Sequence, residues 1–188
     1  GGRDMKKSKT KDLIIKIETP LTEQVIENLK AGDIVLINGY VYTARDAAHK
    51  KIVELIKNDA PLPFSLKGQI IYYVGPTPAP PGKVIGSAGP TTSSRMDIYT
   101  PLLISLGLKG MIGKGQRSEE VKEAIKQYKA VYFLATGGAG AFLSRHIISF
   151  EEIAFSELGT ESVKKLLLKD FPVIVAIDCH GGDIFKKF

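Results

Sequence analysis

Apolar positions follow two spacings along the chain, which predict strands and helices in turn. Short apolar, β-branched runs bounded by turn residues predict strands over 13–17, 33–41, 69–74, 83–87, 109–112, 130–135, 147–155, 163–168 and 173–177. Apolar residues three and four apart predict helices over 22–30, 45–57, 96–106 and 118–128. Thr22 and Ser118 are the expected N-caps, and Pro101 predicts a kink or a second helical start.

This order of elements indicates one α/β domain. Strands alternate with helices through the middle of the chain, and several strands gather near its end. Such an order is typical of a mostly parallel central sheet with additional β structure. The proline-rich segment 75–82 reads as a stiff loop too short to separate two domains. We therefore expect a single domain over 12–188.

Composition and charge exclude several classes of protein. The 188 residues are 44% hydrophobic and 24% charged, as in folded proteins rather than disordered ones. No apolar stretch is long enough for a membrane-spanning helix, so no membrane partner is expected. Residues 1–11 hold five basic side chains and one acidic one, a net of +4, which leaves +2 of the overall +6 for the rest. The excess is a basic tail, with 1–4 a tag remnant, and predicts no nucleic-acid partner.

One cysteine, Cys179, limits the metal and redox chemistry. It excludes an internal disulfide and an iron–sulfur cluster held by this chain's own thiolates. No apolar segment follows the basic start, so a secretory signal is not expected and a cytoplasmic location is. Asp178, Cys179, His180 and Asp183 have the side chains of metal ligands, but the glycines among them favour a surface turn. No metal site is predicted.

Cations and turn residues gather where strands lead into helices. Four consecutive turns of this kind, at 43–46, 89–95, 113–115 and 136–140, are rich in glycine or hydroxyl groups, and three carry Arg45, Arg95 or Lys114. Capping alone can explain such turns. Cations, however, are unfavourable near helix N-termini, so an anion is expected to compensate them. Since ligands bind beyond the carboxyl ends of parallel strands, the sequence predicts a site for a small, multiply charged anion.

Nucleotide motifs are incomplete. Gly107 and Gly113-Lys114 have the wrong spacing for a P-loop, and Gly115 stands where it needs Ser or Thr. The dinucleotide pattern lacks its third glycine at Leu143. His49 shares a helical face with Arg45, where it either reaches a substrate or plays a structural part.

Three long motifs carry a family resemblance. Residues 44–50 (ARDAAHK), 89–97 (GPTTSSRMD) and 111–118 (MIGKGQRS) closely resemble the carboxyl-terminal part of the iron–sulfur class I fumarases. That part is a separate β subunit in some organisms, and the L(+)-tartrate dehydratase β subunit shares the motifs. The resemblance covers nearly all of 13–185; Gln116 replaces an expected asparagine.

The resemblance implies a swivelling β/β/α domain and a hydro-lyase. This chain would be the β subunit of a two-subunit enzyme that reversibly hydrates fumarate, or dehydrates tartrate as the alternative. A 4Fe-4S cluster would be ligated by the partner α subunit, in an αβ or α2β2 hetero-oligomer. A non-catalytic dicarboxylate-binding module is a second alternative, and a nucleotide-binding domain a third.

The resemblance also assigns residues. Arg45, Arg95 and Lys114 would hold substrate carboxylates, and Thr91 would be the catalytic base. A threonine hydroxyl is a very weak base, so nearby cations would have to stabilise its alkoxide. Asp46, His49 and Thr92 are candidates for residues that contact and orient these four without touching the substrate.

Overall fold

The computed structural model describes residues 13–136 and 140–186. The expected tag remnant and basic tail at 1–11, and the glycine-rich turn at 137–139, lie outside the described residues. The strands are β1 (Ile14–Glu18), β2 (Ile34–Thr43), β3 (Ile70–Tyr72), β4 (Gly110–Gly113), β5 (Val131–Ala135), β6 (Ile147–Ala154) and β7 (Val163–Ile177). The α-helices are α2 (Glu23–Glu27), α3 (Asp46–Lys57), α4 (Thr100–Ser105), α5 (Glu119–Tyr128) and α6 (Gly140–Ser144), with 3-10 turns η1 (Ser93–Met96) and η2 (Ser156–Glu161).

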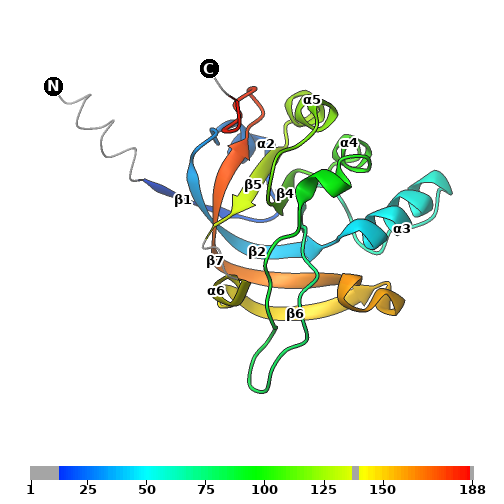
Figure 1. Cartoon of the computed structure of the whole chain (residues 1–188). Coiled ribbons are helices and arrows are strands. Elements are labelled where there is room, and N and C mark those ends of the chain that lie inside the picture. The colour runs from blue at the N-terminus through cyan, green and yellow to red at the C-terminus, as the bar shows by residue number, and fades with distance from the viewer. Residues whose placement is uncertain (1–12, 137–139, 187–188) are drawn as a thin grey trace.

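The strands form one mixed sheet that closes on itself. Their order is β1-β2-β3-β4-β5-β7-β6, and β2 also pairs with β7, so five strands form a barrel-like ring (Figure 1). The α/β class is confirmed. The predicted parallel arrangement holds for β1 through β5, whose pairings in that order are all parallel. The sheet as a whole is mixed rather than mostly parallel, because β7 runs antiparallel to β2, β5 and β6.

β7 is one bent strand where two were predicted. At the bend, Asp170 adopts a left-handed φ of 48°, and Pro172, two residues later, has no N–H for strand pairing. Aspartate and proline are both uncommon inside strands, which explains why the sequence predicts a break there. On the neighbouring strand the register shifts between Ile37 and Gly39. Asn38 Nδ2 donates to Asp170 Oδ1 at 3.1 Å, and Asp170 N donates to Asn38 Oδ1 at 3.0 Å. These bonds hold the two strands together through the bend.

Helix starts follow the predicted capping chemistry. Thr22 Oγ1 accepts from Val25 N at 3.2 Å and Ser118 Oγ accepts from Val121 N at 3.3 Å. The apolar stretch around Pro101 divides into η1 and α4, with the proline in the first turn of α4. The second helical start is therefore confirmed, because proline is tolerated there and not in a helix interior.

The predicted strand over 83–87 is wrong. This segment is one arm of the long loop between β3 and η1, which extends below the sheet in Figure 1. Its arms pair through Thr77 N to Ser87 O and Gly86 N to Thr77 O, both 3.1 Å. Prolines at 76, 78, 80 and 81 supply no N–H groups, so the arms cannot form a regular ladder.

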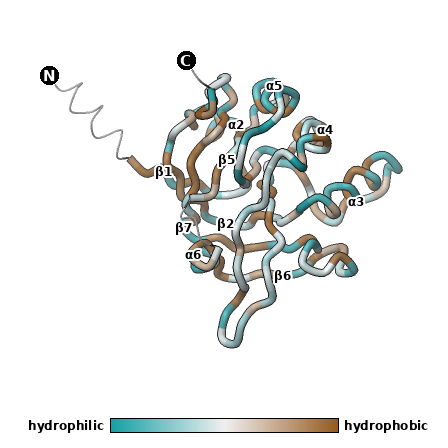
Figure 2. The backbone as a smooth tube through the Cα atoms, viewed as in Figure 1, coloured by the Kyte–Doolittle hydropathy of each residue, from teal (hydrophilic) through white to brown (hydrophobic). Residues whose placement is uncertain are grey.

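Two apolar clusters lie on opposite sides of the sheet. Tyr72, Ile112 and Phe133 belong to one cluster, and their chain neighbours Tyr73, Met111 and Tyr132 belong to the other, beneath α3, α4 and α5. This alternation is the two-residue period of a strand buried on both faces. In Figure 2, brown predominates along β7, whereas α5 shows teal on its outer side. Tyr72 and Tyr73 thus lie on opposite faces of the sheet.

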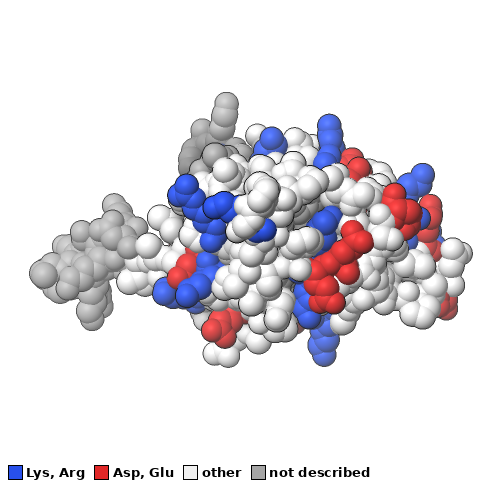
Figure 3. Space-filling view, turned by 90° about the horizontal axis from the view of Figure 1, so that it is seen from below, with Lys and Arg blue, Asp and Glu red and all other residues white. Residues whose placement is uncertain are grey.

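The charged surface is mixed. On the face in Figure 3, Lys and Arg side chains lie interspersed with Asp and Glu side chains. In the described part of the chain, no helix combines the length and apolar character needed to cross a bilayer. At the end of β7, the Asp178 carboxylate accepts from the amides of Ala31, His180 and Gly182, each at 2.8 Å. This confirms the turn predicted for the 178–183 segment.

Candidate functional site

The carboxyl ends of β2, β3, β4 and β5 meet at one edge of the sheet. These strands are parallel neighbours in that order. Ala44 N donates to Tyr72 O at 3.1 Å, which continues the β2–β3 pairing to within one residue of Arg45. The turns that carry Arg45 and Lys114 therefore emerge at the same edge, with the end of β3 between them. The turn with Thr91 reaches the same edge by the long loop, since the strand predicted before it does not form.

Thr91 and Lys114 are held on adjacent segments. Thr91 N donates to Tyr73 O at 2.8 Å, and Ser93 N donates to Lys114 O at 2.9 Å. Between these bonds, Thr92 and Lys114 form a parallel bridge. The segment starting at Thr91 thus lies between the extensions of β3 and β4. Thr91 is half-buried, whereas Thr92 and Lys114 are exposed.

Arg45 occupies the N-cap of α3, and its side chain makes no capping bond there. Its Cδ and Nη1 would each lie 3.1 Å from a Cβ at position 75, so glycine there leaves room for the guanidinium. Arg45 Nε and Asp46 Oδ1 are buried without a hydrogen-bond partner among the described residues. A cation so placed at a helix start fits an anionic ligand.

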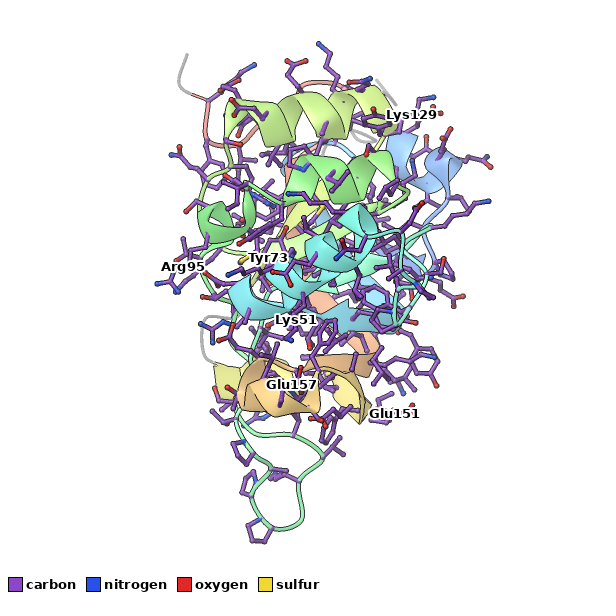
Figure 4. The ribbon with its side chains drawn as sticks, turned by 90° about the vertical axis from the view of Figure 1, so that its right-hand side faces the viewer. Lys51, Tyr73, Arg95, Lys129, Glu151 and Glu157 are labelled. Atoms are coloured by element: carbon purple, nitrogen blue, oxygen red, sulfur yellow. The ribbon has the colours of Figure 1, made fainter. Side chains whose placement is uncertain are left out.

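Arg95 is the predicted site residue that the structure does not bring to the others. It lies on η1, two residues beyond Ser93, and is exposed. Figure 4 shows its side chain pointing away from the ribbon. Among the described residues, its guanidinium forms no ion pair with a carboxylate.

His49 is fully buried beneath this edge. Its Nδ1 lies 2.8 Å from Arg45 O, and its ring packs against Tyr73 and Tyr99 with centroids 5.5 and 5.9 Å away. Burial lowers the pKa of His49 to about 4, with Arg117 lowering it further against the bond to Arg45 O. His49 is therefore neutral near pH 7, with Nδ1–H donating to Arg45 O. This arrangement orients the turn that carries Arg45.

His49 makes stability depend on pH. Because its pKa is lowered on folding, the unfolded chain takes up a proton that the folded chain refuses as pH falls from 6.5 towards 4. The contribution is full above about pH 6.5, and about 3 kcal/mol of unfolding free energy is lost near pH 4. Urea unfolding of wild type and His49→Gln at both ends of this range should show the difference between them shrinking by that amount. Parallel pH curves for the two proteins would contradict the assignment.

A buried polar cluster beneath the edge was not predicted. The Arg117 guanidinium lies between the rings of Tyr73 and Tyr132, with Cζ 5.1 and 4.8 Å from their centroids. Burial lowers the pKa of Arg117, but Tyr73 and Asp97 outweigh it, so the pKa is raised and the cation is permanent. The sequence signal for Arg117 and Asp97 is their position inside the family motifs 111–118 and 89–97. Neither residue directly follows a strand, so the pattern of residues at strand ends did not indicate them.

Metal-ligating side chains are sparse. Within 13–136 and 140–186, no three His, Cys, Asp or Glu side chains come together in a way that could hold a metal ion. Cys179 is buried, burial raises the pKa of its thiol, and its Sγ lies 3.7 Å from His180 Nε2. These residues do not fit an iron–sulfur cluster, which takes several thiolates.

Comparisons with known proteins agree with the motifs at this edge. Residues 3–188 match the family described as Fumarase C-terminus. The chain is 37% identical over 182 residues to fumarate hydratase 2 of Leishmania major, covering 95% of this chain and 32% of that protein. It is 39% identical over 153 residues to the aerobic class I fumarate hydratase of Escherichia coli K12, covering 80% of this chain and 28% of that protein.

A shorter relative matches over nearly its whole length. "Putative L(+)-tartrate dehydratase subunit beta" of Methanocaldococcus jannaschii is 39% identical over 173 residues, 89% of each chain. The chain thus spans about a third of the two fumarate hydratases and most of this subunit. With the family profile matched from residue 3 to the last residue, and with the motifs folded into one sheet edge, the chain belongs to the fumarase C-terminus family.

Proposed function

We propose that the chain is the β component of a two-component hydro-lyase that reversibly adds water to fumarate, giving malate. The observation that supports the proposal is that Arg45, Thr91 and Lys114 all lie at the same edge of the sheet, in a chain of this family. Two cations on one edge suit a ligand with two carboxylates. The same edge leaves Arg95 exposed, where it would close on the substrate from the side of a partner.

The proposed chemistry divides between this chain, which removes one proton from the substrate, and its partner, which supplies another. In the malate-to-fumarate direction, Thr91 Oγ takes the proton from the carbon beside one carboxylate while the hydroxyl on the neighbouring carbon leaves as water. Arg45 and Lys114 stabilise Thr91 Oγ as the alkoxide that takes this proton and becomes a hydroxyl, and they neutralise the charge that builds on the carboxylate. Bidentate contacts with arginine also fix the diacid so that the reacting proton faces Thr91. The proton that completes the water comes from the partner.

The proposed 4Fe-4S cluster belongs to the partner. A single buried cysteine and the absence of a ligand cluster among the described residues leave this chain unable to hold it. The proposal therefore needs an α component that carries the cluster, in an αβ or α2β2 assembly. We also propose that the chain is the swivelling β/β/α domain of this enzyme, and that its movement against the α component opens the site.

The test separates the chain from its partner. The purified chain alone should give no detectable hydration of fumarate, and anaerobic mixing with a cluster-loaded α component should restore turnover. The α component alone should also be inactive, because it lacks Thr91 and the cations. Hydratase activity in a cluster-free preparation of this chain would contradict the proposal.

Tartrate dehydration is the second candidate. The relative from Methanocaldococcus jannaschii is named for that activity and matches 89% of both chains, a mutual coverage that the fumarate hydratases do not have. Parallel assays of the mixed components on fumarate, malate and both tartrates decide between the two substrates. A chain stabilised by dicarboxylates without its partner, and inactive with it, would instead be a non-catalytic binding module.

A further inference from the structure

Arg117 is an unusual residue to bury. Its side chain is 0% exposed, and Nη1 has no hydrogen-bond partner among the described residues. Removing a guanidinium from water is costly unless it is paired, and an apolar side chain would fill the same space more cheaply. A buried cation in this position therefore calls for a use beyond packing.

The contacts of Arg117 all reach segments beneath the candidate site. Nε donates to Asp97 Oδ1 at 2.7 Å, while Nη2 lies 3.0 Å from the Tyr73 hydroxyl and 3.1 Å from Thr100 Oγ1. Tyr73 is the residue whose carbonyl holds Thr91 N. Asp97 stands two residues after Arg95, at the end of η1. Arg117 thus joins the end of β3, with which Thr91 pairs, to the end of the η1 turn that carries Arg95.

The same cluster fixes the turn that carries Lys114. Asp97 Oδ2 accepts from Ser118 N at 2.7 Å, across the base of that turn. The Tyr132 hydroxyl lies 2.7 Å from Gly115 O, which belongs to this turn, and 2.7 Å from Ser93 Oγ, which belongs to the segment that starts at Thr91. A Cβ at Gly113 would stand 2.0 Å from Ser93 Oγ, so the two segments are also closely packed. Two turns, 89–97 and 113–118, and the end of β3 are therefore tied together around one guanidinium.

We propose that Arg117 is a positioning residue for the substrate site. Together with Asp97, Tyr73 and Tyr132, it holds the turn that carries Thr91 and Arg95 and the turn that carries Lys114 in one fixed relation. It touches no substrate and acts through the segments that do. The proposal rests on the proposed function, and it adds a residue that neither the motif reading nor the comparisons assign.

Lysine in place of Arg117 keeps the charge and loses the fork. A lysine can reach one partner but cannot join Asp97, Tyr73 and Thr100 at once. In the assembled enzyme we expect Arg117→Lys to lower kcat/KM about 5- to 20-fold, through a lower kcat and a higher KM together. Tyr132→Phe, which keeps the ring and removes the hydroxyl, should act in the same direction by about 3-fold. Arg145→Lys alters an exposed arginine and should leave both constants unchanged.

A second readout distinguishes positioning from a loss of folded protein. Rates are normalised to folded complex, and amide hydrogen exchange is measured on the unliganded complex. Faster exchange confined to 91–97 and 113–118 in Arg117→Lys supports the proposal. Unchanged exchange in both segments, or kcat and KM within twofold of wild type in folded Arg117→Lys, overturns it. If that variant does not fold, Tyr132→Phe decides by the same measurements. An inactive wild-type complex would contradict the proposed function. Amide hydrogen exchange in 91–97 and 113–118 would still test whether Arg117 holds these two segments.

Discussion

Replacing Thr91 with alanine should lower kcat about 10²- to 10⁴-fold, the range typical of losing a general base. Thr91 is half-buried and contributes its amide, not its side chain, to the hydrogen bond with Tyr73 O. Removing the hydroxyl therefore leaves the local backbone pairing intact. KM should change little, because in the proposed site the carboxylates are held by Arg45, Arg95 and Lys114. The measurement is steady-state turnover of malate and fumarate by the assembled enzyme.

Three variants sharpen this test. Thr91→Ser retains a hydroxyl and should keep much of the rate, whereas Thr91→Val retains the shape and should not. Thr22→Ala removes a threonine that caps α2, so it should cost about 1 kcal/mol of stability and no kcat. Proton exchange at the reacting carbon of malate, followed in deuterated water, should vanish with Thr91→Ala. Continued exchange at the wild-type rate would show that another group removes the proton.

The edge of the sheet was predictable from the sequence because it depends on local signals. Arg45 and Lys114 follow short apolar runs that predict strands, and Ser118 is the N-cap of the next helix. Parallel strands bring such turns together whatever the details of the loops. Thr91 lies at this edge although the strand predicted before it does not form, because its amide pairs with Tyr73 O instead.

Long-range closure and buried charge were not predictable in this way. The sequence divides β7 at Asp170 and Pro172, and only Asn38, 132 residues away, shows why the strand continues through the bend. Pairing of β2 with β7 closes the ring, yet nothing local in either strand specifies its partner. Arg117 resembles a surface cation by type, and only tertiary contacts with Tyr73 and Tyr132 reveal that it is buried.

Arg95→Lys should lower kcat/KM about 10- to 150-fold without destabilising the chain. The side chain is exposed on η1, so its replacement removes no packing. A charge-assisted hydrogen bond contributes about 1.5–3 kcal/mol, and lysine cannot reproduce the planar fork that meets a carboxylate at two points. The loss therefore belongs to substrate binding and not to folding. Thermal unfolding should give the wild-type midpoint for the variant.

A surface lysine in an ion pair elsewhere in the chain provides the control for the Arg95 variants. Lys51 on α3 has its Nζ 3.2 Å from Glu157 Oε1, and Figure 4 shows the two residues on neighbouring segments. Such an exposed pair contributes little to stability or function. Lys51→Met should leave kcat/KM unchanged, whereas Arg95→Ala should lose at least as much as Arg95→Lys. Added guanidinium ion should partly restore Arg95→Ala, because the exposed position admits a small cation, and should leave Lys51→Met unaffected. Wild-type kinetics in Arg95→Lys would remove Arg95 from the site and leave Arg45 and Lys114 to hold the two carboxylates.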